Sequence, residues 1–66
     1  MMYAVDVARE RGEWLATVLT LEGVSTWAST VSDLDRNVRE AIALAEDLPD
    51  GAEDALTISW GYVLGK

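Results

Sequence analysis

The chain has 66 residues, of which twelve are acidic and five are basic, so its formal net charge is −7. A domain this short buries only about 60% of the surface that its unfolded chain exposes. Such small cores usually need disulfides, a structural metal, unusually tight packing or association with another chain. Because the sequence contains no cysteine and no histidine, disulfides and the common zinc sites are excluded, and we expect at least a homodimer.

Two strands joined by a tight turn are predicted at the start of the chain. Residues 2–8 alternate between larger apolar side chains on one face and small or acidic ones on the other, which is typical of a half-buried strand. Gly12 can adopt the positive φ of a hairpin turn. Residues 13–21 then carry apolar side chains on both faces, which indicates a central strand or one covered by a neighbouring subunit.

A third strand and an amphipathic helix follow. Residues 24–29 are rich in β-branched and aromatic side chains, which favours a strand. The apolar spacing then changes to that of one helical face. Its members are Val31, Leu34, Val38, Ala41, Ile42, Ala45 and Leu48.

The ends of this helix are marked by residues that favour helix termini. Thr30 can accept a hydrogen bond from the amide of Asp33 while the Asp33 side chain reaches back, as in a capping box, although Ser32 with Asp35 is a competing start. The run Pro49-Asp50-Gly51 is expected to end the helix.

The last predicted strand spans residues 56–64 and shows the clearest alternation in the sequence. Its apolar face consists of Leu56, Ile58, Trp60, Tyr62 and Leu64. Together the elements predict a single α+β domain over residues 1–66, of β-β-β-α-β order. We expect a three- to four-stranded, antiparallel-type sheet with the helix packed on one face.

Carboxylates are the main candidates for chemistry, because the side chains that most often activate nucleophiles near neutral pH are absent. Asp6 could bind a divalent cation together with a second acid, which would make the chain a metal-dependent nuclease, but isolated strand carboxylates more often face solvent. The acidic run Glu46, Asp47, Asp50, Glu53 and Asp54 lacks the spacing of a calcium loop and is interpreted as a solvated surface. We therefore predict no enzyme activity, no catalytic residue, no cofactor and no metal site.

The three tryptophans are the strongest candidates for a protein-binding role, since indole rings are enriched at interface hot spots. Trp60 lies on the most apolar strand face and is predicted to belong to the core. Trp27, with Thr26 beside it, is predicted to anchor an interface, and Trp14 is a further candidate.

The charge distribution argues against autonomous binding of nucleic acid, because such binding normally needs a basic stripe. The excess of acid favours a basic partner, although acidity alone often serves only solubility. The first residues form neither a signal peptide nor a membrane span, so we expect a cytoplasmic protein.

From Val18 to Thr30 the sequence VLTLEGVSTWAST resembles the HicB family of type II antitoxins. The positions that carry the resemblance through the turn, third strand and helix are Leu21, Gly23, Thr26, Thr30, Asp33, Asn37, Glu40, Ala41 and Ile42. The opening Tyr3-Ala4-Val5 and the turn Gly12-Glu13-Trp14 fit the same frame, so the likeness covers nearly the whole chain. Leu19 stands where the family usually has proline and Ala28 where it usually has glycine.

The resemblance implies a partial ribonuclease-H-like fold without the metal-binding acids of that enzyme, and an oligomer. It also implies a role in blocking a small, basic, HicA-like mRNA interferase toxin. The sequence ends at Lys66, directly after the last predicted strand, so the DNA-binding segment of many family members is not expected. The alternative is a solitary HicB-like interaction module with another protein partner or with none.

Overall fold

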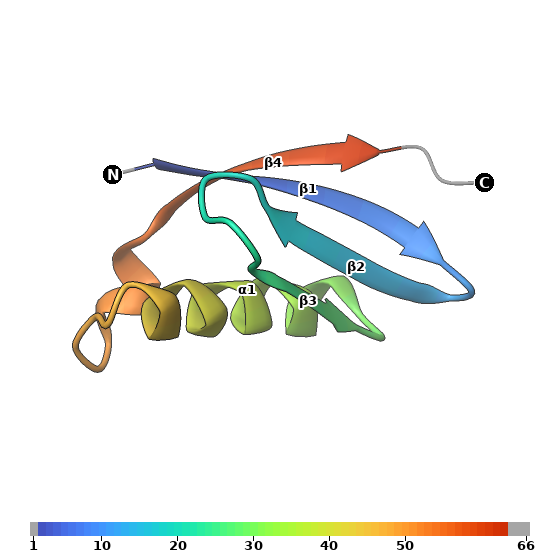
Figure 1. Ribbon diagram of the computed structural model, residues 1–66. Helices are drawn as coiled ribbons and strands as arrows, with labels where there is room; N and C mark the ends of the chain where they lie inside the picture. Colours follow the sequence, from blue (N-terminus) through green and yellow to red (C-terminus); the bar gives the residue numbers. More distant parts are fainter. Residues whose placement is uncertain (1, 64–66) are drawn as a thin grey trace.

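The computed structural model describes residues 2–63, in which four strands form one sheet and a single α-helix packs on one side of it (Figure 1). The elements in chain order are β1 (Met2–Glu10), β2 (Glu13–Val18), β3 (Ser25–Ala28), α1 (Val31–Ala45), the 3-10 helix η1 (Ala52–Ala55) and β4 (Thr57–Val63). The predicted α+β class and element order are confirmed. The short helix η1 lies in a stretch for which no structure was predicted.

The sheet is mixed, with the strand order β3-β2-β1-β4. β2 pairs antiparallel with both β1 and β3, whereas β4 pairs parallel with β1. The prediction of an antiparallel-type sheet is therefore wrong for the last strand. The reason is that α1 carries the chain back along the whole sheet between β3 and β4 (Figure 1), and a crossover of this kind makes the strands that it connects run in the same direction.

The hairpin between β1 and β2 is closed by a loop that consists of Arg11 and Gly12. Arg11 and Gly12 both have positive φ, at 53° and 82°, and Glu10 pairs with Glu13 on either side of them. Two consecutive residues with positive φ are characteristic of a type I′ turn, whose twist matches that of the strands. The predicted turn at Gly12 is confirmed. The second strand ends at Val18, three residues earlier than predicted. The chain turns there, and the Val18 amide donates to the carbonyl oxygen of Val24 at 2.9 Å.

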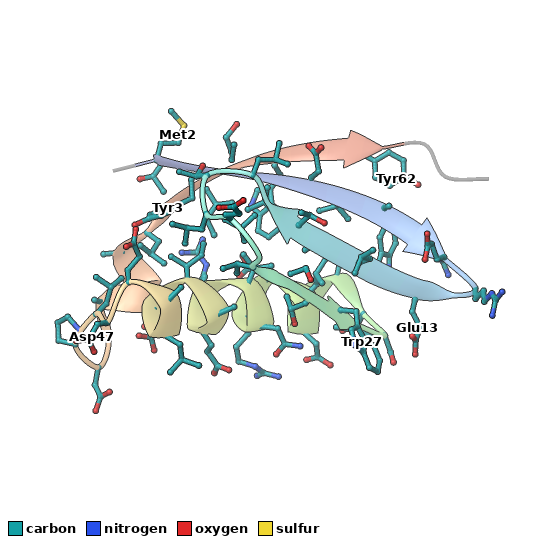
Figure 2. All side chains as sticks on the ribbon, in the orientation of Figure 1. Met2, Tyr3, Glu13, Trp27, Asp47 and Tyr62 are labelled. Carbon is teal, nitrogen blue, oxygen red and sulfur yellow. The ribbon has the colours of Figure 1, made fainter. Side chains whose placement is uncertain are left out.

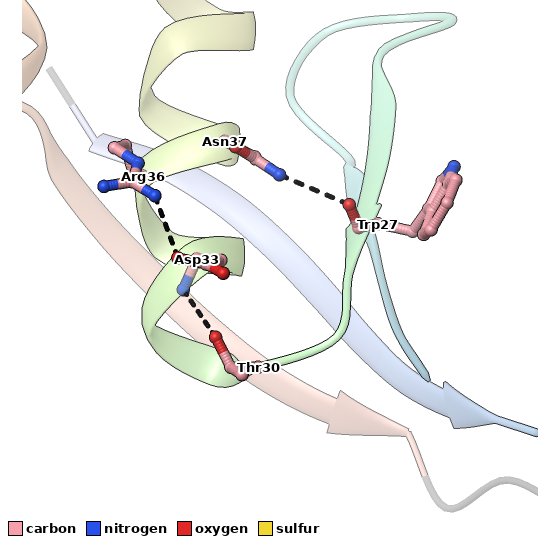
Figure 3. A network of polar contacts seen from close by, with 5 residues as sticks. All are labelled: Trp27, Thr30, Asp33, Arg36 and Asn37. Carbon is pink, nitrogen blue, oxygen red and sulfur yellow. Dashed lines mark hydrogen bonds and ion pairs between the residues drawn. The ribbon is translucent and has the colours of Figure 1, made fainter. Parts of the chain in front are cut away.

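The start of α1 is capped by Thr30, as predicted (Figure 3). The Thr30 Oγ1 accepts a hydrogen bond from the Asp33 amide at 3.1 Å. The Asp33 carboxylate does not complete the capping box, because it accepts from Arg36 Nη2 at 2.8 Å instead. One turn later Asn37 Nδ2 donates to the carbonyl oxygen of Trp27 at 3.3 Å, which ties the helix to β3.

The helix ends at Ala45, earlier than the Pro49-Asp50-Gly51 run predicts. Asp47 adopts a positive φ of 55°. Its amide donates to Leu44 O at 3.3 Å, and the Leu48 amide donates to Ala43 O at 2.9 Å. This pair of bonds is a Schellman motif, with an aspartate at the position that glycine usually occupies.

The core lies between α1 and the middle of the sheet. The helix buries Leu34, Val38 and Ile42, three members of the predicted apolar face. They pack with buried side chains of the first three strands, namely Tyr3, Val5, Val7, Ala16, Val18 and Ala28. The helix lies against β2 and β3, so β4 is at the margin of the layer that it covers.

Tyr3 connects this core to the end of the helix. Its ring is buried, and its hydroxyl donates to Glu46 Oε2 at 2.9 Å. The hydrogen bond to Glu46 raises the pKa of Tyr3 above 10.0, and burial and the negative charge of Glu46 act in the same direction. Since the folded state holds this proton more tightly than the unfolded chain, stabilisation by the neutral tyrosine is complete below pH 10 and is lost as the pH rises through the higher folded-state value.

This linkage predicts the alkaline titration of a chain in which Tyr62→Phe leaves Tyr3 as the remaining tyrosine. Absorbance of the phenolate should show a midpoint above pH 10, since the neutral hydroxyl is the form that Glu46 stabilises. Adding Glu46→Gln should move the midpoint back toward 10. Equal midpoints in the two chains would show that Glu46 does not hold this proton.

Candidate protein-binding site

An apolar groove opens on the helix side of the sheet, between the start of α1 and the second half of β4. Its volume is about 470 Å³. The helix contributes Val31, Leu34 and Asp35, and the strands contribute Val7, Trp14, Trp60, Gly61 and Tyr62. We refer to this hollow as the aromatic groove.

The groove exists because α1 does not cover the end of β4. Leu56 and Ile58, where the strand begins, pack against the core. Further along the same face Trp60 is 43% exposed and Tyr62 is 58% exposed. The prediction that Trp60 belongs to the core is therefore wrong, because the helix lies over β2 and β3 and does not cover this part of β4.

Arg39 fixes where β4 starts. Its Nη1 donates to the carbonyl oxygens of Glu53 and Leu56, at 3.0 and 2.9 Å. Its Nε donates to Asp35 Oδ1 at 3.1 Å. This one side chain joins α1, η1 and the residue before β4, so it sets the position from which β4 leaves the helix.

Two further contacts shape the wall of the groove. The rings of Trp14 and Tyr62 lie 6.1 Å apart at an angle of 56°, an arrangement that stabilises aromatic pairs. The guanidinium of Arg9 lies 5.0 Å from the centre of the Trp14 ring, within the range of a cation–π interaction. The lining of the groove thus combines partly exposed aromatic rings with the acid Asp35 on the helix, and Arg9 lies beside it against Trp14.

The face of the sheet that points away from α1 has no covering element among residues 2–63, and we refer to it as the uncovered face. Met2 points to this side in Figure 2. Trp27 is 60% exposed there, in register with Leu15 on β2, and its ring points away from the helix in Figure 3.

Asp6 lies on the uncovered face, on the inner strand next to β4. Its neighbours across the sheet are Thr17 on β2 and Gly61 on β4. A Cβ on Gly61 would lie 3.0 Å from Asp6 Oδ1, so the missing side chain of Gly61 makes room for this carboxylate. Within residues 2–63 the ion pairs are formed by Arg36 with Asp33 and by Arg39 with Asp35, and Asp6 takes part in neither.

The acidic side chains do not gather into a metal centre in the part of the chain that the structure describes. There, no group of three or more acids is close enough to hold an ion. Neither strand beside Asp6 places a second acid opposite it. In the acidic run after α1, Glu46 accepts from Tyr3 and Glu53 Oε1 accepts from the Gly51 amide at 3.1 Å.

The three predicted interface residues do not form one surface. Trp27 lies on the uncovered face, whereas Trp14 and Thr26 lie on the helix side of β2 and β3, as their register with Ala28 and Ala16 shows. Trp14 lines the aromatic groove. The members of the groove that the sequence patterns placed on buried faces but that are exposed are Val31, Trp60 and Tyr62. The pattern gives the face of a side chain but not the strands over which the helix lies.

In residues 2–63 no helix has the length and apolar character needed to cross a membrane. Comparison of the chain with protein-family models, with curated proteins and with solved structures gave no match.

Proposed function

We propose that this chain is a non-enzymatic, HicB-like antitoxin-type protein of the cytoplasm, which binds a small basic HicA-like toxin and covers its active surface. The observation that carries the proposal is the aromatic groove, in which Trp60 and Tyr62 are held partly exposed on a chain of net charge −7. Exposed aromatic side chains beside an apolar hollow are typical of protein-binding hot spots. The negative charge favours encounter with a basic partner and competes with RNA for the same cationic surface.

The fold is compatible with this proposal. The resemblance to HicB antitoxins implies a sheet with one covering helix in β-β-β-α-β order, and residues 2–63 have that order. Three of the matching positions have structural roles here: Thr30 caps the helix, Asn37 binds the Trp27 carbonyl and Ile42 is buried. Self-association remains part of the proposal, and the surface around Trp27 at the β3 edge is the one we propose for it.

The alternative is a solitary HicB-like module with a different protein partner. It is favoured by Leu19, which is well exposed in the turn after β2 where the family usually has proline. A changed surface residue next to a shared framework is consistent with a changed partner.

Co-expression with a small basic protein, if one is encoded beside this chain, tests the antitoxin proposal. The chain should relieve growth arrest by that protein, and the double substitution Trp60→Ser with Tyr62→Ser should weaken binding at least about tenfold, since it removes the two exposed rings of the groove. Leu44→Ser is the matched control, because Leu44 is more exposed and lies away from the groove.

Binding is measured by titration calorimetry, with circular dichroism to show that each variant is folded. If the neighbouring protein is not toxic, or does not bind, the antitoxin role is wrong and the solitary module is favoured. If both serine substitutions leave the affinity unchanged, the groove is not the binding site.

A further inference from the structure

β4 forms an edge of the sheet that lacks the usual protection against pairing. Among the strands that the structure describes, it pairs with β1 alone. Natural edge strands are commonly very short or carry lysine or proline. β3, at the opposite edge, has only four residues, whereas β4 has seven and none of them is lysine, arginine or proline. Its outer backbone groups are therefore a template for another strand.

The two faces beside this edge differ in character. On the helix side, Trp60 and Tyr62 border the aromatic groove. On the uncovered face, Gly61 leaves the Asp6 carboxylate without a side chain between it and the edge. Since side chains alternate along a strand, a chain added to β4 would present one residue to the groove and the next to Asp6.

The geometry allows a long basic side chain to reach Asp6. A strand added to β4 would lie two strand spacings from β1, about 10 Å away. The side chain of a lysine or arginine on the added strand can span most of this distance by passing over Gly61, and the Asp6 side chain extends from β1 to meet it. Asp6 is a partly buried strand residue that forms no ion pair with another residue of the range 2–63, so a cation from a partner can pair with it there.

We propose that the outer edge of β4 binds an extended, basic segment of a partner protein as a fifth strand, with a lysine or arginine over Gly61 facing Asp6 and an adjacent apolar side chain in the aromatic groove. The proposal rests on the protein-binding function proposed above and names the part of the partner that is recognised. Its signature is an apolar residue next to a basic one, or separated from it by two residues, so that the two side chains point to opposite faces.

A second copy of this chain fits the edge less well. Residues 57–63 contain no basic side chain, so pairing of two β4 strands would leave both Asp6 carboxylates unneutralised. Charge complementarity at Asp6 therefore favours a basic partner over self-pairing at this edge.

Synthetic peptides test the proposal on the full chain. The probe is an eight-residue peptide of β-branched residues with leucine followed directly by lysine at its centre. In a second peptide glutamate replaces lysine, and in a third one residue separates leucine from lysine, so that both point to the same face. We expect amide NMR shifts concentrated in residues 57–63 with the first peptide, and affinities about tenfold or more weaker for the other two.

Asp6→Asn provides the site-specific test. It should weaken binding of the lysine peptide about fivefold and leave binding of a glutamine-substituted peptide unchanged. Glu13→Gln is the matched control, because it removes the same charge. By the alternation along β2, Glu13 also lies on the uncovered face, but away from β4. Circular dichroism before titration checks that both variants keep the fold.

Four results would overturn the proposal. Equal affinity for the lysine and glutamate peptides would show that Asp6 does not bind the cation. Equal loss of affinity for the lysine peptide in Asp6→Asn and Glu13→Gln would show the same. Shifts centred on residues 25–28 would place the added strand at the other edge. Shifts in residues 57–63 that grow with protein concentration without peptide would assign the edge to a second copy.

These outcomes are separate from the antitoxin test. Relief of toxicity without peptide binding at β4 would leave the proposed function intact and remove only the fifth strand. Peptide binding at β4 without a toxic neighbour would retain the fifth strand and favour the solitary module.

Discussion

Replacing Ile42 by alanine is expected to lower the free energy of unfolding by about 3 kcal/mol. The side chain is 0% exposed in the middle of the face that α1 turns to the sheet, so its truncation loses both the transfer free energy of the removed groups and the packing around the remaining void. Proteins of this length have a total stability of roughly 3 to 10 kcal/mol. The substitution therefore removes a large part of what holds the fold.

Urea unfolding followed by tryptophan fluorescence measures this effect. Leu44→Ala is the matched control on the same helix, because Leu44 is 84% exposed and should change the free energy of unfolding by less than about 0.5 kcal/mol. Similar losses for the two variants would mean that the helix does not present its Leu34, Val38 and Ile42 face to the sheet.

Arg39→Met is expected to lower the free energy of unfolding by about 2 kcal/mol. Methionine keeps the aliphatic stem but removes the charged donor from two backbone carbonyls and from Asp35, and hydrogen bonds to charged groups contribute about 1.5 to 3 kcal/mol. The Arg39 side chain is only 23% exposed, so water replaces these bonds poorly. For a domain of this size the loss corresponds to a fall in melting temperature of about 10 °C.

The matched control is Arg36→Met. Arg36 forms its ion pair with Asp33 at the surface, where its side chain is 66% exposed, and such pairs contribute at most about 1 kcal/mol. Calorimetric melting compares the two variants. If Arg36→Met destabilises as much as Arg39→Met, the carbonyl bonds of Arg39 are not what fixes the start of β4.

The parts of the fold that could be predicted from the sequence are those set by local patterns. The alternation of β1, the turn at Gly12 and the cap at Thr30 each depend on neighbouring residues, and all three are present. The direction of β4 was predicted incorrectly. An alternating apolar pattern is the same for a parallel and an antiparallel neighbour, and only the path of α1 across the sheet decides between them.

The end of the helix shows a second limit. Pro49 marks a point that a helix rarely passes, but the chain already leaves the helical path at Asp47. Aspartate adopts positive φ less readily than glycine, so an aspartate in the sequence does not indicate that the helix ends there. The Schellman bonds to Ala43 and Leu44 become visible only once the backbone is known.

The candidate site was harder to predict than the fold. The three tryptophans are equally conspicuous in the sequence, yet they lie in three different places. Trp14 is half-buried in the wall of the groove, Trp27 lies on the uncovered face, and Trp60 lies on the part of β4 that the helix does not cover. Exposure depends on which strands α1 covers, and that is decided by the packing of its buried face against β2 and β3. No pattern within a single element contains this information.

The parallel pairing of β1 with β4 also has a consequence for synthesis of the protein. Of the four strands, β1 is synthesised first and β4 last, but they are direct neighbours in the sheet: β1 is an inner strand and β4 is the edge strand beside it. While the chain is still being translated, the hairpin of β1 and β2 can form, whereas the other side of β1 stays open until the ribosome has passed residue 63. Pairing of β4 with β1 is therefore expected to be a late step of folding, and until it occurs the open side of β1 can pair with other chains.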